Sequence, residues 1–202
     1  MTRHEECIRP ANPIHEEGLK FAEYMDIASA GGFRTLFGKR YERIVSAVFL
    51  KPNHDLSYET ARFAVREGKI IGMASGYSAV EFANFDQTAL AQAAGPSAFR
   101  VNCACTLISP MLRFLHTYEV GDFYLQFLAV DKAARGQGIG TALIAAMETE
   151  AREKHATRLA IDVSARNPNA RRLYERQGFA RIASWPQARM LPKSVLRLVK
   201  DL

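Results

Sequence analysis

The sequence contains no long apolar run and little cysteine, and each shortage narrows the classes of protein to consider. No stretch of 18 apolar residues occurs, so a membrane-spanning helix is excluded. The residues after Met1 are polar and lead into no apolar core of a signal peptide, so we expect a cytoplasmic protein. The three cysteines are Cys7, Cys103 and Cys105, and we expect small buried thiols. A metal site would need further ligands, and only His116 stands nearby, so we predict none.

The sequence also lacks a run of lysine and arginine, although it is basic overall. The formal net charge is +6 and the pI is about 9.4, which favours an anionic ligand or partner. Without a basic run long enough to form a binding arm, a generally basic surface is favoured over a nucleic-acid site. At 202 residues, 48% of them hydrophobic, the chain suits one well-buried core. We therefore predict a single domain over residues 1–202.

What the sequence does contain is a strand, a glycine-rich turn and a helix in direct succession. Residues 124–130 are apolar, aromatic and β-branched, as in a strand buried on both faces. Gly136, Gly138 and Gly140 follow, and a helical period begins there. A glycine turn lets backbone N–H groups approach a ligand, and a helix start adds unpaired N–H groups and a positive dipole end. This order of elements indicates an anion site.

Several anion-binding motifs share this order of elements. Arg135 adds a fixed positive charge suited to phosphate. A P-loop requires a lysine after its last glycine, but Gly140 is followed by Thr141, which excludes it. A dinucleotide fingerprint remains a minor alternative, because residues 131–135 separate the strand from the glycines, although Asp162 follows in a later strand. A flexible turn without a ligand is the other alternative, and an arginine with three alternating glycines argues against it.

These residues resemble a known family. The run Arg135-Gly136-Gln137-Gly138-Ile139-Gly140, preceded by Leu128-Ala129-Val130, is similar to the acyl-CoA-binding motif of the GNAT superfamily of N-acetyltransferases. The family's second marker, Asn-x-x-Ala-x-x-Leu-Tyr-x-x-x-Gly-Phe, is matched by Asn167, Ala170, Leu173-Tyr174-Glu175 and Gly178-Phe179. The resemblance implies an α/β fold with a mixed central β-sheet flanked by helices, and acetyl-CoA as co-substrate.

The resemblance also implies transfer of an acetyl group to a primary amine by direct attack, and it assigns roles to residues. The strand splays from its neighbour, the thioester lies in the gap, and the backbone N–H of Leu128 polarises its carbonyl. Tyr174 protonates the departing thiolate as general acid; the alternative for Tyr174 is a core aromatic. Asn167 both caps its helix and contacts CoA. The implied cofactor-binding residues are Leu128, Ala129, Val130, Arg135, Gly136, Gln137, Gly138, Ile139, Gly140, Thr141, Asn167 and Tyr174.

The general base is not identified by the resemblance. Many relatives have a glutamate on the central strand where this chain has Gln126, which cannot take up a proton. Asp122, Glu119 and His116 are close in sequence and are candidates, acting directly or through water. A weakly basic amine would need no strong base.

The rest of the sequence predicts an alternation of strands and helices. We expect further strands at 5–9, 60–66, 70–77, 158–163, 179–184 and 190–199, the second and third joined by a hairpin turn at 67–69. We expect helices from Asn12 as N-cap and Pro13 as first residue to position 28, at 39–49, at 139–155, and from Asn167 to a C′ glycine at Gly178. Residues 31–38 are a candidate acceptor loop or, alternatively, a hydrophobic connection packed on the sheet.

Residues 79–121 depart from the family pattern and predict an inserted helical segment before the central strand, with one or two helices interrupted near Pro110. An insertion of this length is functional or oligomeric in most compact domains, so a lid over the acceptor and a homodimer contact are the alternatives.

Three functions are compatible with the sequence. The first is acetyl transfer to a small-molecule amine or a peptide. The second is a CoA-binding module without catalysis, which Gln126 favours and an intact Tyr174 disfavours. The third is an acetyltransferase for protein or charged tRNA, for which the positive charge is a hint and salt-dependent RNA binding the discriminating measurement.

Overall fold

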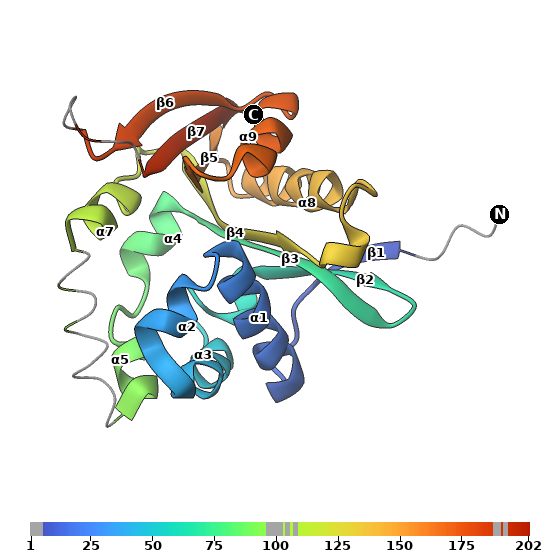
Figure 1. The fold of residues 1–202 in the computed structure, drawn as a ribbon, viewed down its shortest axis with the longest axis vertical. Helices are drawn as coiled ribbons and strands as arrows, with labels where there is room; N and C mark the ends of the chain where they lie inside the picture. The colour runs from blue at the N-terminus through green and yellow to red at the C-terminus, as the bar shows by residue number, and fades with distance from the viewer. Residues whose placement is uncertain (1–5, 96–102, 104–105, 107–108, 188–190, 192–193) are drawn as a thin grey trace.

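The structure is a computed structural model that describes residues 6–95, 103, 106, 109–187, 191 and 194–202. A seven-stranded sheet with the order β1-β2-β3-β4-β5-β7-β6 runs through the molecule (Figure 1). Its strands are β1 Glu6–Pro10, β2 Ala61–Arg66, β3 Lys69–Ser78, β4 Asp122–Val130, β5 Arg158–Ser164, β6 Ala180–Trp185 and β7 Val195–Asp201. All neighbours are antiparallel except β4 and β5, which are parallel. The predicted mixed sheet is confirmed.

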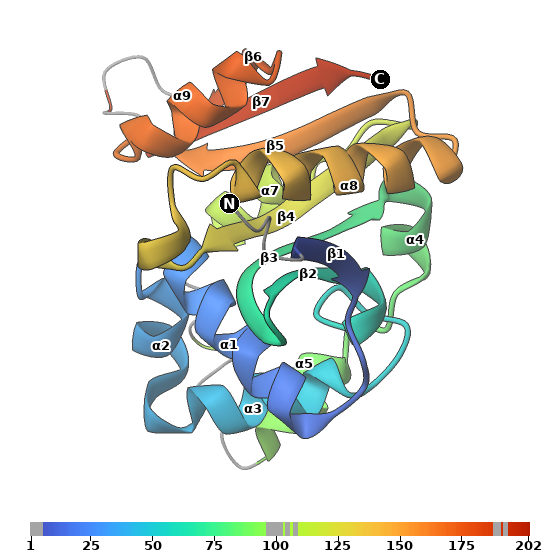
Figure 2. The same cartoon turned by 90° about the vertical axis from the view of Figure 1, so that its right-hand side faces the viewer.

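Helices cover both faces of this sheet (Figure 2). On one face lie α1 His15–Ala28, α2 Gly32–Phe37, α3 Tyr41–Phe49 and α5 Ala89–Ala94, and we call it the α1–α3 face. On the other face lie α8 Ile139–Glu153 and α9 Pro168–Arg176, and we call it the α8 face. Two further short helices, α4 Ala79–Asn84 and α7 Ser109–Leu115, belong together with α5 to the predicted insertion. Among the described residues, no helix is long and apolar enough to span a membrane.

The helix α3 shows how the apolar pattern fixes one layer. Its buried apolar residues recur at the spacing i, i+3, i+4, i+7, i+8, which forms a single stripe. They are Tyr41, Ile44, Val45, Val48 and Phe49. This stripe packs in one core cluster with Phe21 and Met25 of α1 and with Phe63 and Met73 of the sheet. A second cluster lies on the α8 face.

The β2–β3 hairpin has the turn that its sequence predicts. Arg66 pairs with Lys69, so Glu67 and Gly68 alone form the loop. Both have positive φ, 51° and 74°, as a two-residue turn that matches the strand twist requires.

The predicted start of the first helix is wrong. The helix begins at His15 with Ile14 as N-cap, and no side chain caps it. Asn12 instead donates its backbone N–H and its side-chain Nδ2 to the carboxylate of Glu17, at 2.6 and 2.8 Å. Arg9 of β1 pairs with the same carboxylate at 2.7 Å. The buried Glu17 of α1 thus holds the turn before the helix through its side chain. This contact is not one that the N-cap pattern predicts. The Asn167 cap and the Gly178 C′ position of α9 are confirmed.

The expectation of buried thiols is also wrong where it can be checked. Cys7 and Cys103 are both exposed. Cys7 lies on β1, an edge strand of the sheet. Cys105 lies outside the described residues. No group of three or more metal-ligating side chains occurs within the described part of the chain.

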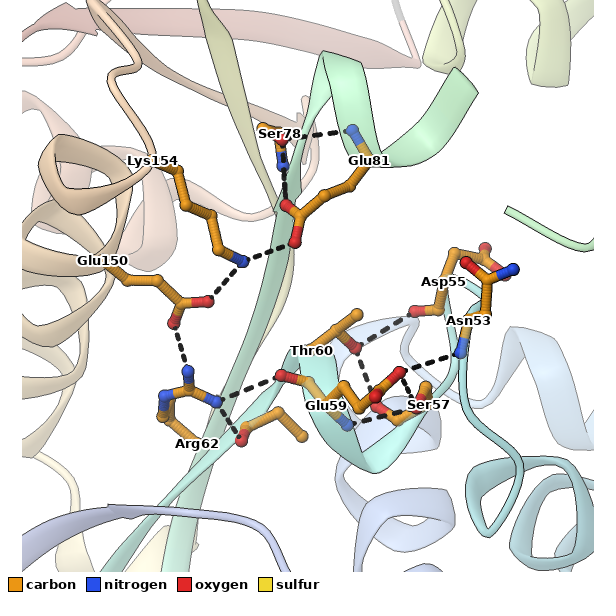
Figure 3. A network of polar contacts seen from close by, with 11 residues as sticks. Asn53, Asp55, Ser57, Glu59, Thr60, Arg62, Ser78, Glu81, Glu150 and Lys154 are labelled. Carbon is orange, nitrogen blue, oxygen red and sulfur yellow. Dashed lines mark hydrogen bonds and ion pairs between the residues drawn. The ribbon is translucent and has the colours of Figure 1, made fainter. Parts of the chain in front are cut away.

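The inserted segment is anchored to the sheet at both described ends. At its start Ser78 and Glu81 form a capping box for α4, and Glu81 also pairs with Lys154, the C-cap residue of α8, at 2.8 Å (Figure 3). At its end the buried Arg197 of β7 donates to the main-chain oxygens of Phe114 and Leu115, the last two residues of α7, and of Thr117 just beyond it. Carbonyl groups at the C-terminal end of a helix carry a partial negative charge, so a cation suits them. Pro110 is the second residue of α7, where a helix tolerates proline, and residues 107–108 before it are not described.

Candidate functional site

The parallel strands β4 and β5 separate halfway along their length. Their pairing runs only from Asp122 with Arg158 to Leu125 with Ile161. Pairing of β4 with β3, on the other side, continues as far as Val130. The second half of β4 therefore has a free edge toward β5, and we call this gap the β4–β5 opening.

The free edge of β4 presents main-chain groups of Leu128 and Val130 to the opening. The backbone N–H of Asp131 donates to Ile71 O on the β3 side at 3.0 Å. Inward and outward groups alternate along an antiparallel strand, so the N–H and C=O groups of Val130 and Leu128 face away from β3. Consistent with this, Val130 O accepts a hydrogen bond from Arg135 Nε at 3.0 Å. Leu128 and Val130, two of the predicted cofactor-binding residues, thus have main-chain groups available to a ligand along this edge.

A β-bulge lies at Gln126, where the opening begins. Ser75 of β3 pairs with Phe127 and Gly76 pairs with Leu125, so Gln126 is an extra residue in β4. Leu125 and Leu128 pack on the α8 face, whereas Phe127 packs in the cluster of the α1–α3 face. The side chain of Gln126 reaches Asp55, which follows α3, so it lies on the α1–α3 face as well.

The glycine turn after β4 leads directly into α8. Gly136 and Gly138 have φ values of 75° and 90°, which only glycine adopts at low cost. Gly138 is the N-cap of α8, no side chain caps it, and the first bond of the helix runs from Ala142 N to Gly138 O. The amides of Ile139, Gly140 and Thr141 precede that bond and are free for a ligand. A Cβ at Gly136 or Gly138 would meet nothing within 4 Å, so the turn is open.

Gln137 holds the glycine turn in place through its side chain. Its Nε2 donates to Ala133 O at 2.9 Å, and its Oε1 accepts from Arg66 of β2 at 2.7 Å. The predicted cofactor contact of Gln137 would therefore have to be made by its main chain. Arg135, Gly136, Gln137 and Thr141 are exposed, as a surface ligand site requires.

The second motif lies against the first. Leu173 of α9 comes within 3.2 Å of the position that a Cβ on Gly140 would occupy, so the glycine allows α9 to approach the start of α8. Asn167 Oδ1 caps α9 by accepting from Ala170 N at 3.0 Å. Figure 2 shows α9, the glycine turn and the C-terminal ends of β4 and β5 at one end of the sheet.

Tyr174 is buried, with 4% of its surface exposed, and its ring lies 5.6 Å from that of Phe179. Burial raises the pKa of Tyr174 and keeps the phenol protonated. This state suits both the proton-donor role and the packing role.

Two of the predicted base candidates are held in ion pairs. Asp122 is buried and contacts Arg158 at 2.7 Å, and Glu119 contacts the same arginine at 2.9 Å. Both lie at the N-terminal end of β4, whereas the glycine turn follows its C-terminal end. The ring of His116 instead packs 5.1 Å from Phe82 of α4.

Asp55 is the acid that the sequence analysis missed. Its Oδ2 accepts a hydrogen bond from Gln126 Nε2 at 2.9 Å, across 71 positions of sequence. A carboxylate therefore stands beside the position where the family has a glutamate. Burial raises the pKa of Asp55, although the hydrogen bond from Gln126 lowers it in part. No motif marks this residue, because it lies in a loop and reaches β4 only in the folded chain.

The loop around Asp55 is held by its own hydrogen bonds (Figure 3). Thr60 Oγ1 donates to Asp55 O at 3.3 Å, and Ser57 caps the following turn by accepting from Glu59 N at 3.1 Å. His54 is buried, accepts from Leu56 N at 3.1 Å through Nδ1, and lies 2.8 Å from Val48 O through Nε2. These hydrogen bonds fix the conformation of the loop that carries the Asp55 carboxylate.

Comparisons with known proteins agree with this geometry. The family model described as "Acetyltransferase (GNAT) family" matches residues 32–179. Acetyltransferase Atu2258 of Agrobacterium fabrum is 47% identical over 64 residues, which are 32% of this chain and 45% of that relative. An N-acetyltransferase from Staphylococcus aureus Mu50 has a TM-score of 0.65 at 16% identity, covering 96% of this chain and 99% of the other.

A PaiA N-acetyltransferase from Thermoplasma acidophilum, solved in complex with coenzyme A, has a TM-score of 0.55 at 12% identity, covering 98% of this chain and 99% of that one. These two structures share the fold. The family model covers most of the sheet, the glycine turn and the second motif. The chain therefore belongs to the acetyltransferase (GNAT) family.

Proposed function

We propose that the protein transfers an acetyl group from acetyl-CoA to an amine by direct attack at the β4–β5 opening. The observation that carries this proposal is that three structural features lie together at the β4–β5 opening. They are the free edge of β4 at Leu128 and Val130, the open glycine turn, and the second motif on α9. Family membership supports acetyl-CoA as the donor.

The residues of the chain fit the donor in two parts. The amides of residues 136–141 and the guanidinium of Arg135 suit the phosphates, because the turn is open and begins a helix. The outward main-chain groups of Leu128 and Val130 suit the amides of a pantetheine arm. The donor supplies a thioester, whose carbonyl carbon is the electrophile.

Two groups of the chain then act on the reacting atoms. The backbone N–H of Leu128 donates to the thioester oxygen and stabilises the charge that develops there. Tyr174 gives a proton to the departing thiolate; burial keeps its hydroxyl protonated until that moment.

The proposal is tested by calorimetric titration with acetyl-CoA, followed by release of CoA thiol in the presence of a panel of amines. We expect binding, and turnover with at least one amine class. Binding without release from any amine would favour the non-catalytic CoA-binding module, and no binding would overturn the proposal.

The general acid is tested by Tyr174→Phe, for which we expect turnover ~10- to 100-fold lower with acetyl-CoA affinity nearly unchanged. Tyr41→Phe is the matched control, because Tyr41 is also buried but donates to Ala22 O at 2.6 Å within the core. The control should lose stability and keep turnover. Full turnover in Tyr174→Phe would make Tyr174 a packing residue.

A further inference from the structure

Two buried polar atoms beside the bulge have no hydrogen-bond partner among the described residues. They are Ser75 Oγ and Gln126 Oε1. Ser75 is fully buried on β3, and its side chain lies on the same face as Met73, two residues before it, which packs in the α1–α3 face cluster. Native proteins rarely leave such atoms unpaired, so this pair points to a missing partner.

The hydrogen bond to Asp55 defines which partner is missing. A carboxylate only accepts hydrogen bonds, so the NH2 group of Gln126 must face Asp55, and its Oε1 is a free acceptor. No lysine or arginine in the described part of the chain pairs with Asp55. A carboxylate, an amide oxygen and a hydroxyl therefore lie together on one face, and all three can accept hydrogen bonds from N–H donors. An alkylammonium group has three such donors and a positive charge.

Aromatic side chains lie close to Asp55. The charge of Asp55 contributes to the raised pKa of Tyr77 and of Tyr118, although burial is the larger cause for both. The hydroxyls of these two tyrosines lie 3.0 Å apart, and the ring of Tyr118 lies 5.0 Å from Phe82 of α4. Tyr118 and Phe82 both belong to the insertion and are partly exposed. Aromatic rings suit an alkyl chain that carries a cation.

The three polar groups also lie next to the reacting atoms of the proposed function. Gln126 precedes Leu128 by two residues on β4, about 7 Å along a strand. Asp55 approaches from the α1–α3 face, and the glycine turn lies at the start of α8, which covers the other face. A molecule bound at Asp55 would therefore meet the thioester from the opposite side of the sheet.

We propose that the acceptor is a primary alkylamine, bound as its ammonium ion by Asp55, Gln126 and Ser75, and that Asp55 takes up the proton that frees it for attack. The inference rests on the proposed function and names its substrate class. It makes the insertion a wall of the acceptor site.

Over the whole reaction, one proton passes from the ammonium group to solvent. An N–H bond of the ammonium breaks and an O–H bond forms on Asp55. The freed nitrogen lone pair bonds to the thioester carbon, the C–S bond breaks, and Tyr174 protonates the sulfur. As the amide forms, the nitrogen loses a second proton. This proton reaches Tyr174 through water and replaces the proton that Tyr174 gave to the sulfur. Asp55 then returns its proton to solvent. Because burial raises the pKa of Asp55, the carboxylate is a stronger base than an exposed one.

The test compares Asp55→Asn with the wild type on alkylamines (phenethylamine, n-butylamine, spermidine) and on aniline, which carries no ammonium proton at neutral pH. We expect kcat/KM for alkylamines to fall ~100-fold or more, acetyl-CoA affinity to be unchanged, and any activity on aniline to change less than about threefold. Asp86→Asn is the matched control, an exposed aspartate near the same loop, and should behave as the wild type. Equal alkylamine activity in Asp55→Asn and the wild type would overturn the proposal.

A rescue variant separates a chemical role from a structural one. Asp55→Asn combined with Gln126→Glu exchanges the two ends of the 2.9 Å hydrogen bond and restores a carboxylate to the site. We expect it to recover at least tenfold in kcat/KM over Asp55→Asn. No recovery from a folded double variant that still binds acetyl-CoA would contradict the proposal.

A binding measurement keeps the inference separate from the proposed function. Titration of phenethylammonium without acetyl-CoA should give saturable binding to the wild type and a loss of affinity of at least tenfold in Asp55→Asn. Absence of thiol release with retained alkylammonium binding would overturn the proposed acetyl transfer alone. Absence of alkylammonium binding in a protein that releases thiol with aniline alone would overturn the acceptor assignment alone.

Discussion

The two sides of the β4–β5 opening are built in different ways. The donor side that we propose is made of main-chain groups from one continuous stretch, residues 128–141, with α9 packed beside it. The acceptor side that we propose is made of side chains from separate segments, namely Asp55, Ser75, Tyr118 and Gln126. A site built from contiguous residues is recognisable in the sequence as a motif. A site built from side chains that are far apart in the sequence is not. The proposed donor site can therefore be predicted from the sequence, whereas the proposed acceptor site can be found only in the folded structure.

The largest effect that we expect follows from detaching the insertion from the sheet. Arg197→Met removes the cation that contacts the carbonyls at the end of α7 and leaves the buried Asp162, its ion-pair partner at 2.6 Å, without a cationic partner. Breaking a buried pair in this way costs about 3–5 kcal/mol of unfolding free energy. Urea unfolding measures the loss, and thiol release should show that alkylamine KM rises more than acetyl-CoA affinity falls.

The control for this variant removes both charges. Arg197→Met combined with Asp162→Asn leaves no uncompensated carboxylate, so the double variant should be more stable than Arg197→Met alone. A double variant that is less stable than the single one would show that the carbonyl contacts, and not the ion pair, hold the insertion.

The next effect concerns the donor side alone. Gly138→Glu puts a side chain at φ 90° and a negative charge where we place the phosphates, so acetyl-CoA affinity should fall ~100-fold. Calorimetric titration with acetyl-CoA measures this, and titration with phenethylammonium should show no change. Gly95→Glu is the control for backbone strain, because Gly95 also has a positive φ and open space around it but lies at the end of α5. Unchanged acetyl-CoA affinity in Gly138→Glu would refute the phosphate assignment.

The smallest effect concerns the acceptor side alone. Ser75→Ala removes a buried hydroxyl that has no partner among the described residues, so the free energy of unfolding should rise by about 1 kcal/mol. The same change removes a hydrogen-bond acceptor for the ammonium, so alkylamine KM should rise by about threefold to tenfold. Ser57→Ala is the control with the opposite sign. Because Ser57 caps a turn, this variant should lose about 1 kcal/mol of unfolding free energy. A destabilised Ser75→Ala with unchanged KM would show that Ser75 has a partner within the protein.

The sequence predicts those parts of the fold in which neighbours in the chain determine the geometry. The hairpin at Glu67-Gly68, the cap of α9 at Asn167 and the strand–turn–helix unit are local, and the structure contains all three. The predicted start of α1 fails because Glu17 and Arg9, which are not N-cap residues, organise the preceding turn. Asp55 is missed for the same physical reason: its contact with Gln126 exists only after α3 and β4 are packed.

The bulge at Gln126 has a consequence for insertions and deletions in β4. Leu125 faces α8, Gln126 and Phe127 face the opposite layer, and Leu128 faces α8 again. A strand without Gln126 would alternate regularly and would keep each of these apolar side chains in its present layer. Packing of the core therefore does not require Gln126. The bend that a bulge introduces coincides with the end of β4–β5 pairing at Leu125. A chain shortened by this one residue should therefore keep its core and fold with a straighter β4, but the β4–β5 opening should close.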